Sequence, residues 1–227
     1  MDHFESYADE RHLAACAFCA GLTGTQDHCP SRVFLDQPYP PRLPVVPACR
    51  KCNNGFSLDE QYLACLISCV KAGSTDPSDI EREKIRRILT EKPALRARLQ
   101  NARNASESGV QFEAEMHRVA SVMKKLAQGH ALYELGEPRQ SDPDELIIRP
   151  LITLTDEEFD FFEHPEPSEI WPEVGSRAMQ RIAENFGDPG WLEVQKGRYR
   201  FHAKAGSGIE IRIVIDEYLA AYCRWAE

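Results

Sequence analysis

Two CxxC pairs near the start of the chain constrain its fold more than any other sequence feature. Cys16 and Cys19 form the first pair, in CAFC, and Cys49 and Cys52 form the second, in CRKC. Zinc prefers four thiolates in a tetrahedron, and two such pairs joined by a loop supply them. We therefore expect a structural Zn²⁺ on these four cysteines. The alternative is that they are reduced cysteines of an ordinary core.

The chain has eight cysteines, and the other four need separate explanations. Cys29 lies inside the bridged loop and could replace one of the four zinc ligands. We do not expect it to do so, because it directly follows His28 and neighbouring strand residues point to opposite faces. Cys65 and Cys69 lie four apart on the apolar side of an expected helix, which is typical of core cysteines. The N-terminus has no basic patch followed by an apolar run, and no stretch approaches the roughly 18 apolar residues of a membrane span. We therefore expect a cytoplasmic protein, in which CxxC pairs favour metal over disulfides.

The charge is unevenly distributed along the 227 residues, although the net value is −9. There are 6 basic and 8 acidic residues up to Gly73, 11 and 8 from Ser74 to Lys125, and 10 and 20 after that. The acidity therefore belongs to the C-terminal part, which leaves room for a basic face earlier in the chain. That face would comprise Arg82, Lys84, Arg86, Arg87, Arg96, Arg98 and Arg103. Its cations either contact nucleic acid or are solvated and paired with nearby glutamates, and both interpretations stay open.

Three regions are expected from composition and hydrophobic periodicity, at residues 1–72, 73–140 and 141–227. In the first, SLDE at Ser57 to Glu60 predicts the capped start of a helix with an apolar stripe. In the second, DIEREKIRRILTEK predicts an amphipathic helix, which Pro93 interrupts or restarts, and VQFEAEMHRVASVMKKLAQGHALYEL predicts another. The middle of the chain is therefore expected to be mostly helical.

The last region is expected to be built mainly from strands. ELIIRPLITL reads as a strand, and WLEVQ, RYRFHAK and IEIRIVI predict an antiparallel meander with turns at KG and AGSG. The acidic TDEEFDFFEHPEPSE predicts an exposed loop or edge, and DEYLAAYCRWAE predicts a short closing helix. The expected fold class is α+β.

Three polar residues that could take part in catalysis lie near the cysteine pairs in the sequence. Asp27 and His28 stand between them, and Asn53 directly follows the second pair. Carboxylate and amide oxygens suit a hard cation such as Mg²⁺, so Asp27 and Asn53 are candidate ligands for one beside the histidine.

The order CxxC, Asp-His, CxxCN resembles the HNH nuclease superfamily in its ββα-metal, treble-clef form with a zinc-binding cysteine quartet. The resemblance covers about residues 14 to 70, and RLPVVPAC lacks the asparagine that many members carry before the second pair. It implies that Asp27 and Asn53 bind a catalytic Mg²⁺ or Mn²⁺, that His28 is the general base, and that DNA is the substrate. A role in host defence or in a mobile element would fit the same family.

Cations beside this site would bind the phosphate backbone, and we expect that role for Arg32, Arg50 and Lys51. Further polar groups either complete a metal shell or cap the helix, namely Asn54, Asp59 and Glu60. One alternative is a non-catalytic zinc module that binds DNA or protein. Another is a nuclease held inactive by a regulatory protein, with the acidic segment as the contact or as a DNA mimic.

Overall fold

The structure is a computed structural model that describes residues 10–41, 43–106, 109–183 and 190–226. The chain forms two compact units, of which one comprises Met1–Gly55 with Met123–Glu227 and the other comprises Phe56–Val122. Both units mix helices and strands. None of the described helices has the length and apolar character that a membrane span requires.

The N-terminal part of the first unit has the order strand, strand, helix. After the short helix α1 (Glu10–Leu13), strands β1 (Thr25–His28) and β2 (Val45–Ala48) pair antiparallel, with Asp27 opposite Val46. The loop between them contains the 3-10 turn η1 (Arg32–Phe34), and helix α2 (Arg50–Ala72) begins two residues after β2. This order brings the start of α2 close to the hairpin.

The C-terminal part of the same unit is a five-stranded antiparallel sheet. It consists of β5 (Glu145–Pro150), β6 (Leu192–Gln195), β7 (Tyr199–Gly206), β8 (Gly208–Ile215) and β9 (Leu219–Trp225), in the spatial order β5-β9-β8-β7-β6. The predicted meander is therefore confirmed. Its tightest turn requires glycine, because Gly208 has φ +117° and a Cβ there would lie 2.2 Å from the carbonyl oxygen of Trp225.

Two predictions for this region are wrong. The expected closing helix is strand β9, because the segment pairs with both β5 and β8 and buries residues on both of its faces. The expected acidic loop contains helix α6 (Asp156–Glu163). Thr155 and Glu158 form a reciprocal capping box at its start, and Phe162 packs against Val214 of the sheet. The remaining short elements here are η4 (Leu151–Thr153) and α7 (Arg177–Ala183).

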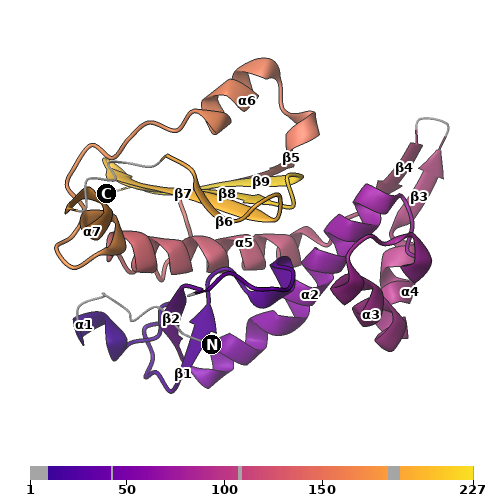
Figure 1. The fold of residues 1–227 in the computed structure, drawn as a ribbon, viewed down its shortest axis with the longest axis horizontal. Helices are drawn as coiled ribbons and strands as arrows, with labels where there is room; N and C mark the ends of the chain where they lie inside the picture. Colours follow the sequence, from indigo (N-terminus) through magenta and orange to yellow (C-terminus); the bar gives the residue numbers. More distant parts are fainter. Residues whose placement is uncertain (1–9, 42, 107–108, 184–189, 227) are drawn as a thin grey trace. The chain divides into compact units, whose positions relative to one another are not determined.

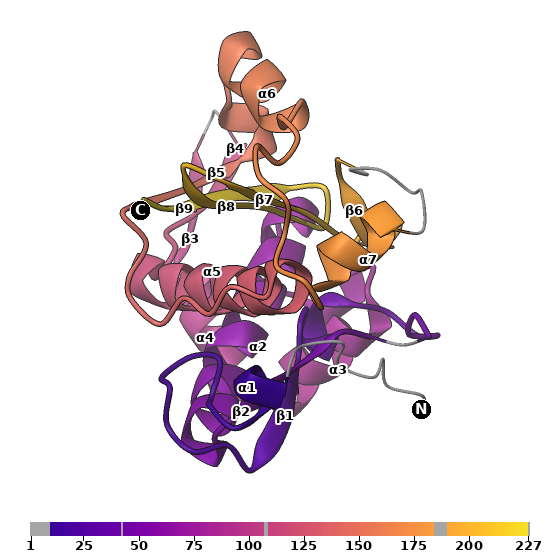
Figure 2. The ribbon, with the colours of Figure 1, turned by 90° about the vertical axis from the view of Figure 1, so that its left-hand side faces the viewer.

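Helix α5 (Met116–His130) continues into a π-helical turn, η3 (Ala131–Leu135). Within the first unit, its part from Met123 onward runs between the β1–β2 hairpin and the sheet, as Figures 1 and 2 show. On the hairpin side, the Cys29 thiol donates to the carbonyl of Leu126 at 3.4 Å. On the sheet side, the His130 ring stacks on Phe201 with centroids 3.7 Å apart. This part of α5 is the centre of the unit's core.

The second unit contains most of α2, the 3-10 turn η2 (Pro77–Asp79), helices α3 (Glu83–Glu91) and α4 (Pro93–Asn101), and the hairpin of β3 (Arg103–Ser106) and β4 (Gly109–Phe112). Pro93 restarts the helix, as one of the two predicted outcomes had it. The predicted capping box at Ser57 to Glu60 is wrong, because α2 already begins at Arg50 and these residues lie inside it. The next helix begins at Met116, after β4, and so is shorter than predicted.

Candidate metal centre and the polar site beside it

The sulfur atoms of Cys16, Cys19, Cys49 and Cys52 gather in one cluster in the first unit. The four Sγ atoms lie within 4.8 Å of one another, and those of Cys19 and Cys49 are 3.8 Å apart. Four zinc–sulfur bonds of about 2.3 Å in a tetrahedron place the sulfurs about 3.8 Å apart, whereas a disulfide needs about 2 Å. The donor set and its spacing therefore fit a tetrahedral metal ion such as zinc.

The first CxxC pair sits in a tight turn that is anchored to β2. The backbone N–H of Cys16 donates to the Gly21 carbonyl at 2.7 Å, and that of Ala20 donates to the Cys16 carbonyl at 2.9 Å. Ala20 adopts φ +57°, which closes the turn and brings the chain back toward the sulfurs. The N–H of Ala17 reaches the Pro47 carbonyl at 2.9 Å, which fixes the turn against the hairpin.

The second pair stands at the start of α2. Cys49 directly precedes the helix, and its sulfur accepts the backbone N–H of Cys52 at 3.4 Å. That hydrogen bond is the main cause that lowers the pKa of the Cys49 thiol to about 7, which favours the thiolate that metals bind. Burial is the main cause that raises the pKa of the Cys52 thiol, and its side-chain hydrogen bond with Cys49 raises it further. A bound cation would therefore favour ionisation of both thiols of this pair.

Asn53, one residue after the second pair, joins the first turn of α2 to β1. Its Nδ2 donates to Thr25 Oγ1 at 3.1 Å and to the backbone carbonyl of Gln26 at 3.0 Å. Because a backbone carbonyl can only accept, the amide nitrogen is the atom that faces the Gln26 carbonyl, which leaves Oδ1 outside these two hydrogen bonds. Within the described part of the chain Oδ1 accepts no hydrogen bond, so this oxygen is suited to bind a cation.

Asp27 is 8 % exposed and lies against α5. The ammonium Nζ of Lys125 is 2.8 Å from Asp27 Oδ2 and donates to Ser31 Oγ at 2.9 Å. Nothing in the sequence pattern pointed to Lys125 as a partner of this site. The neighbouring Lys124 pairs with Asp142, and nothing in the spacing of two adjacent lysines in a helix shows which one reaches a distant strand.

His28 ends β1 opposite Val45 and is half-buried. Since neighbouring strand residues alternate, its side chain leaves the strand on the face opposite to Asp27. Thr25 shares the Asp27 face and is the residue that Asn53 contacts, so Asp27 and Asn53 lie on one side of β1 and His28 on the other. The three candidate catalytic residues are therefore neighbours along one strand and one helical turn, but only two share a face.

The remaining candidate residues have varied surroundings. Arg50 and Lys51 are exposed on the first turn of α2, and neither makes an ion pair with any residue that the structure describes. Arg32 is half-buried, with its guanidinium 5.8 Å from the centre of the Tyr39 ring. Asn54 is exposed and Glu60 is buried. In the second unit, Asp59 pairs with Arg118 at 2.6 Å, which is a structural rather than a metal-binding environment.

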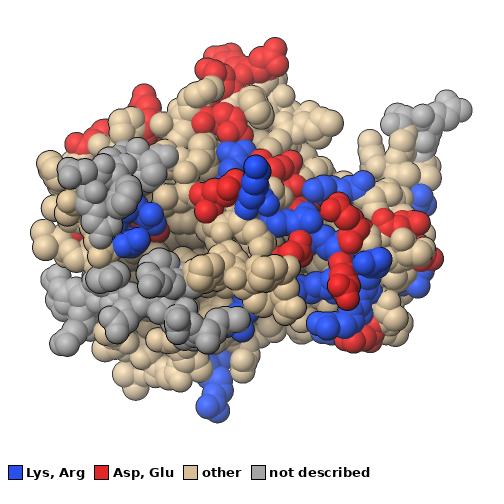
Figure 3. Space-filling model, in the orientation of Figure 1, with Lys and Arg blue, Asp and Glu red and all other residues tan. Residues whose placement is uncertain are grey.

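The basic residues of the second unit are largely engaged by protein groups. Arg82 is 5 % exposed, Arg96 pairs with Asp76 at 3.1 Å, and Arg98 lies 3.7 Å from Glu115. In Figure 3, basic and acidic side chains are interspersed over the region of α3 and α4, and acidic ones gather over α6. For these arginines the paired interpretation describes the structure better than a continuous basic face.

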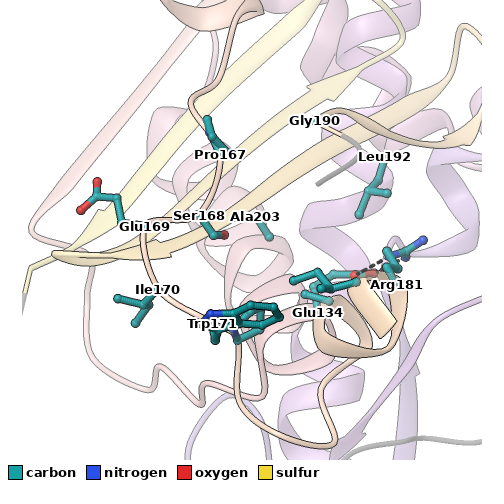
Figure 4. A pocket seen from close by; sticks show the side chains of 13 residues that line it. Glu134, Pro167, Ser168, Glu169, Ile170, Trp171, Arg181, Gly190, Leu192 and Ala203 are labelled. Carbon is teal, nitrogen blue, oxygen red and sulfur yellow. Dashed lines mark hydrogen bonds and ion pairs between the residues drawn. The ribbon is translucent and has the colours of Figure 1, made fainter. Parts of the chain in front are cut away.

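A separate pocket of about 240 Å³ opens in the C-terminal part of the first unit (Figure 4). It is lined mainly by apolar residues, and at one side Arg181 holds the fully buried Glu134 through two hydrogen bonds of 2.9 and 3.3 Å. Burial raises the pKa of Glu134, which the guanidinium opposes. Because the Arg181 guanidinium and the Glu134 carboxylate compensate each other, we interpret the pair as part of the fold and not as a ligand site.

Comparison with protein-family models finds none that matches the chain, and comparisons with curated proteins and with solved structures find no match. The HNH assignment therefore stays a prediction that rests on the motif residues. What the structure shows is a four-cysteine cluster able to hold a metal ion, next to a polar site on β1 and α2.

Proposed function

We propose that this chain is a metal-dependent nuclease of the HNH type that hydrolyses phosphodiester bonds in DNA. The observation that carries the proposal is the pair of hydrogen bonds from Asn53 to β1, made one residue after the cysteine cluster. They fix the first turn of α2 against the strand that bears Asp27 and His28. A zinc ion on the four sulfurs would hold the same turn through Cys49 and Cys52.

Asp27 and Asn53 would hold the catalytic Mg²⁺ or Mn²⁺ through a carboxylate oxygen and the amide oxygen. When bound, such a cation neutralises charge that develops on the phosphate and on the departing oxygen. The burial of Asp27 supports this role, because a carboxylate in a poorly solvated place attracts a cation more strongly than one in water. The Oδ1 of Asn53, which the hydrogen bonds to β1 do not use, would supply the second oxygen.

His28 would accept the proton of the attacking water, since an imidazole is able to do so near neutral pH. Its partial exposure at the end of β1 is compatible with access to solvent and substrate. Because it leaves the strand on the face opposite to Asp27, the reacting phosphate would have to lie at the edge of β1, within reach of both faces. Arg50 and Lys51, exposed on the adjoining helical turn, would contact the phosphate backbone.

The second candidate function is a zinc-held binding module without catalysis. The Lys125–Asp27 pair favours it, because the ammonium already neutralises the carboxylate without any cation. This candidate predicts a bound zinc ion, no second divalent cation that depends on Asp27, and no cleavage after long incubation with Mn²⁺. The two functions therefore differ in a simple assay.

The test is cleavage of supercoiled plasmid DNA by the purified protein in Mg²⁺ or Mn²⁺. His28→Ala and Asn53→Ala are expected to lower the rate by about 100-fold or more, the usual effect of losing a proton acceptor or a cation ligand. The matched controls are Asn104→Ala and His117→Ala, which change exposed residues of the same types outside the proposed site.

All variants should carry the same zinc content as the unmodified protein, so that a loss of activity reports the polar site and not the fold. If the unmodified protein leaves the plasmid intact in both metals, or if His28→Ala cuts as fast as the control variants, the proposed function is wrong.

A further inference from the structure

The buried ammonium of Lys125 is a polar feature of the first unit that the proposed reaction does not use. Its side chain is 2 % exposed, and it contacts Asp27 Oδ2 at 2.8 Å and Ser31 Oγ at 2.9 Å. Its Nζ also lies 5.7 Å from the centre of the Phe18 ring, close to the first cysteine pair. These contacts come from two segments of the chain, the turn of the first cysteine pair and residues 27–31.

A lysine in such a place needs specific partners, because burying an ammonium without compensation is costly. The helix that carries it is also brought unusually close to the hairpin. A Cβ on Gly129 would lie 2.7 Å from Cys29 Sγ, so only glycine permits the observed approach of α5 to the residues that follow β1. Because α5 lies this close to the hairpin, the Lys125 ammonium is held as a fixed positive charge beside the Asp27 carboxylate.

We propose that Lys125 is a positioning residue that orients Asp27 and weakens the binding of a divalent cation to the Asp27–Asn53 site in the free protein. This inference rests on the proposed function. The ammonium and the cation would share one carboxylate, so the ammonium lowers the affinity of this site for the cation. A bound phosphodiester brings negative charge that offsets this repulsion, so the cation is recruited together with the substrate.

The expected size of the effect follows from Coulomb's law. Two cations that share a carboxylate lie about 5 Å apart, and even with the dielectric constant of water the repulsion between a single and a double charge amounts to about tenfold in affinity. A less polar surrounding increases it. Without Lys125 the Asp27 side chain is also less well oriented, which lowers the affinity for the cation. This effect is smaller than the gain from removing the repulsion.

The test measures the binding of Mn²⁺ alone to the zinc-loaded protein, with free Mn²⁺ followed by its electron paramagnetic resonance signal. Lys125→Met is expected to bind Mn²⁺ at least about tenfold more tightly than the unmodified protein. Lys125→Gln, which keeps a hydrogen-bond donor and removes the charge, is expected to show the same direction and serves as the second variant if Lys125→Met does not fold. Lys124→Met is the matched control, because Lys124 pairs with Asp142 instead, and its affinity should equal that of the unmodified protein.

Asp27→Asn is included to show which part of the Mn²⁺ binding belongs to this site. If Asp27-dependent binding is present but is equal or weaker in the Lys125 variants, the inference about Lys125 is wrong while the proposed cation site stands. If no variant shows binding that depends on Asp27, the cation site of the proposed function is itself contradicted, and the inference with it.

Discussion

His130 is the most deeply buried histidine among the described residues, with no exposed surface. It stacks on Phe201, and its Nε2 lies 2.7 Å from the Tyr199 hydroxyl. Burial lowers the pKa of His130 to about 3, so the ring is neutral in the folded protein near pH 7. It therefore belongs to the packing between α5 and β7 and has no part in the proposed reaction.

This burial predicts a loss of stability in acid. The unfolded chain takes up a proton on this imidazole as the pH falls below about 6.5, whereas the folded protein does so only near pH 3. Between these values acidification favours unfolding, by at most about 1.4 kcal/mol per pH unit. We expect the free energy of unfolding, measured in urea from pH 7 to pH 4, to fall less steeply for His130→Phe than for the unmodified protein.

The control for this prediction is His117→Gln, which removes an exposed histidine of the same helix. Its free energy of unfolding should follow the pH dependence of the unmodified protein. Identical pH dependence in His130→Phe and the unmodified protein would mean that His130 is protonated in the folded state at mild pH.

Which single residues can be found from sequence depends on how local their partners are. The four sulfurs form a cluster because each CxxC pair closes its own turn, and the spacing encodes that turn. Lys125 could not be found this way, because its partner Asp27 is distant in sequence and the contact depends on how α5 crosses the hairpin. Periodicity shows that a helix has a polar side, and it does not show what that side meets.

At the scale of elements, the contact between α5 and the segment after β1 depends on Gly129. A helix-interior glycine normally costs about 1 kcal/mol relative to alanine, so its presence here needs a reason. The reason is steric, because an added Cβ would lie 2.7 Å from Cys29 Sγ and 3.2 Å from Cys29 Cβ. The small residue is what lets the helix carry Lys125 to Asp27.

Gly129→Ala is therefore expected to lower the free energy of unfolding by about 1–3 kcal/mol in spite of the gain in helix propensity, because overpacking outweighs it. The same change in a Cys29→Ala background should cost less, since the sulfur that it meets is gone. Urea denaturation of the four proteins of this double-mutant cycle measures the difference.

Gly55→Ala in α2 is the control, because an added Cβ there meets nothing within 4 Å. It should leave stability unchanged or raise it. Equal costs of Gly129→Ala with and without the Cys29 sulfur would contradict the steric account.

Elements with alternating apolar residues and clear turns were predictable, as β6, β7 and β8 are. The errors arose where a local pattern competed with sheet pairing or capping. Leu219 to Trp225 satisfies a helical pattern, but two neighbouring strands offer it hydrogen bonds on both sides. Thr155 with Glu158 formed a capping box that the acidic composition of its segment concealed, whereas Ser57 with Glu60 matched the same pattern inside a longer helix.

At the scale of the whole molecule, the chain passes from the first unit to the second inside α2 and returns inside α5. Composition could not show this, because both helices run through the crossing without a turn, even at Asn54-Gly55 in α2. The metal cluster, Asn53, Asp27 and Lys125 nevertheless all belong to the first unit. The proposed site therefore depends on a long-range arrangement that joins the N-terminal hairpin to residues after Met123.

The proposed site requires that one metal ion on the four sulfurs organises the start of α2. The most direct measurement is the metal content of the purified chain by native mass spectrometry. One zinc ion is expected in the unmodified protein and in Cys69→Ala, which changes a buried cysteine outside the cluster, and none in Cys49→Ser. A metal-free unmodified protein, or a full zinc complement in Cys49→Ser, would contradict it.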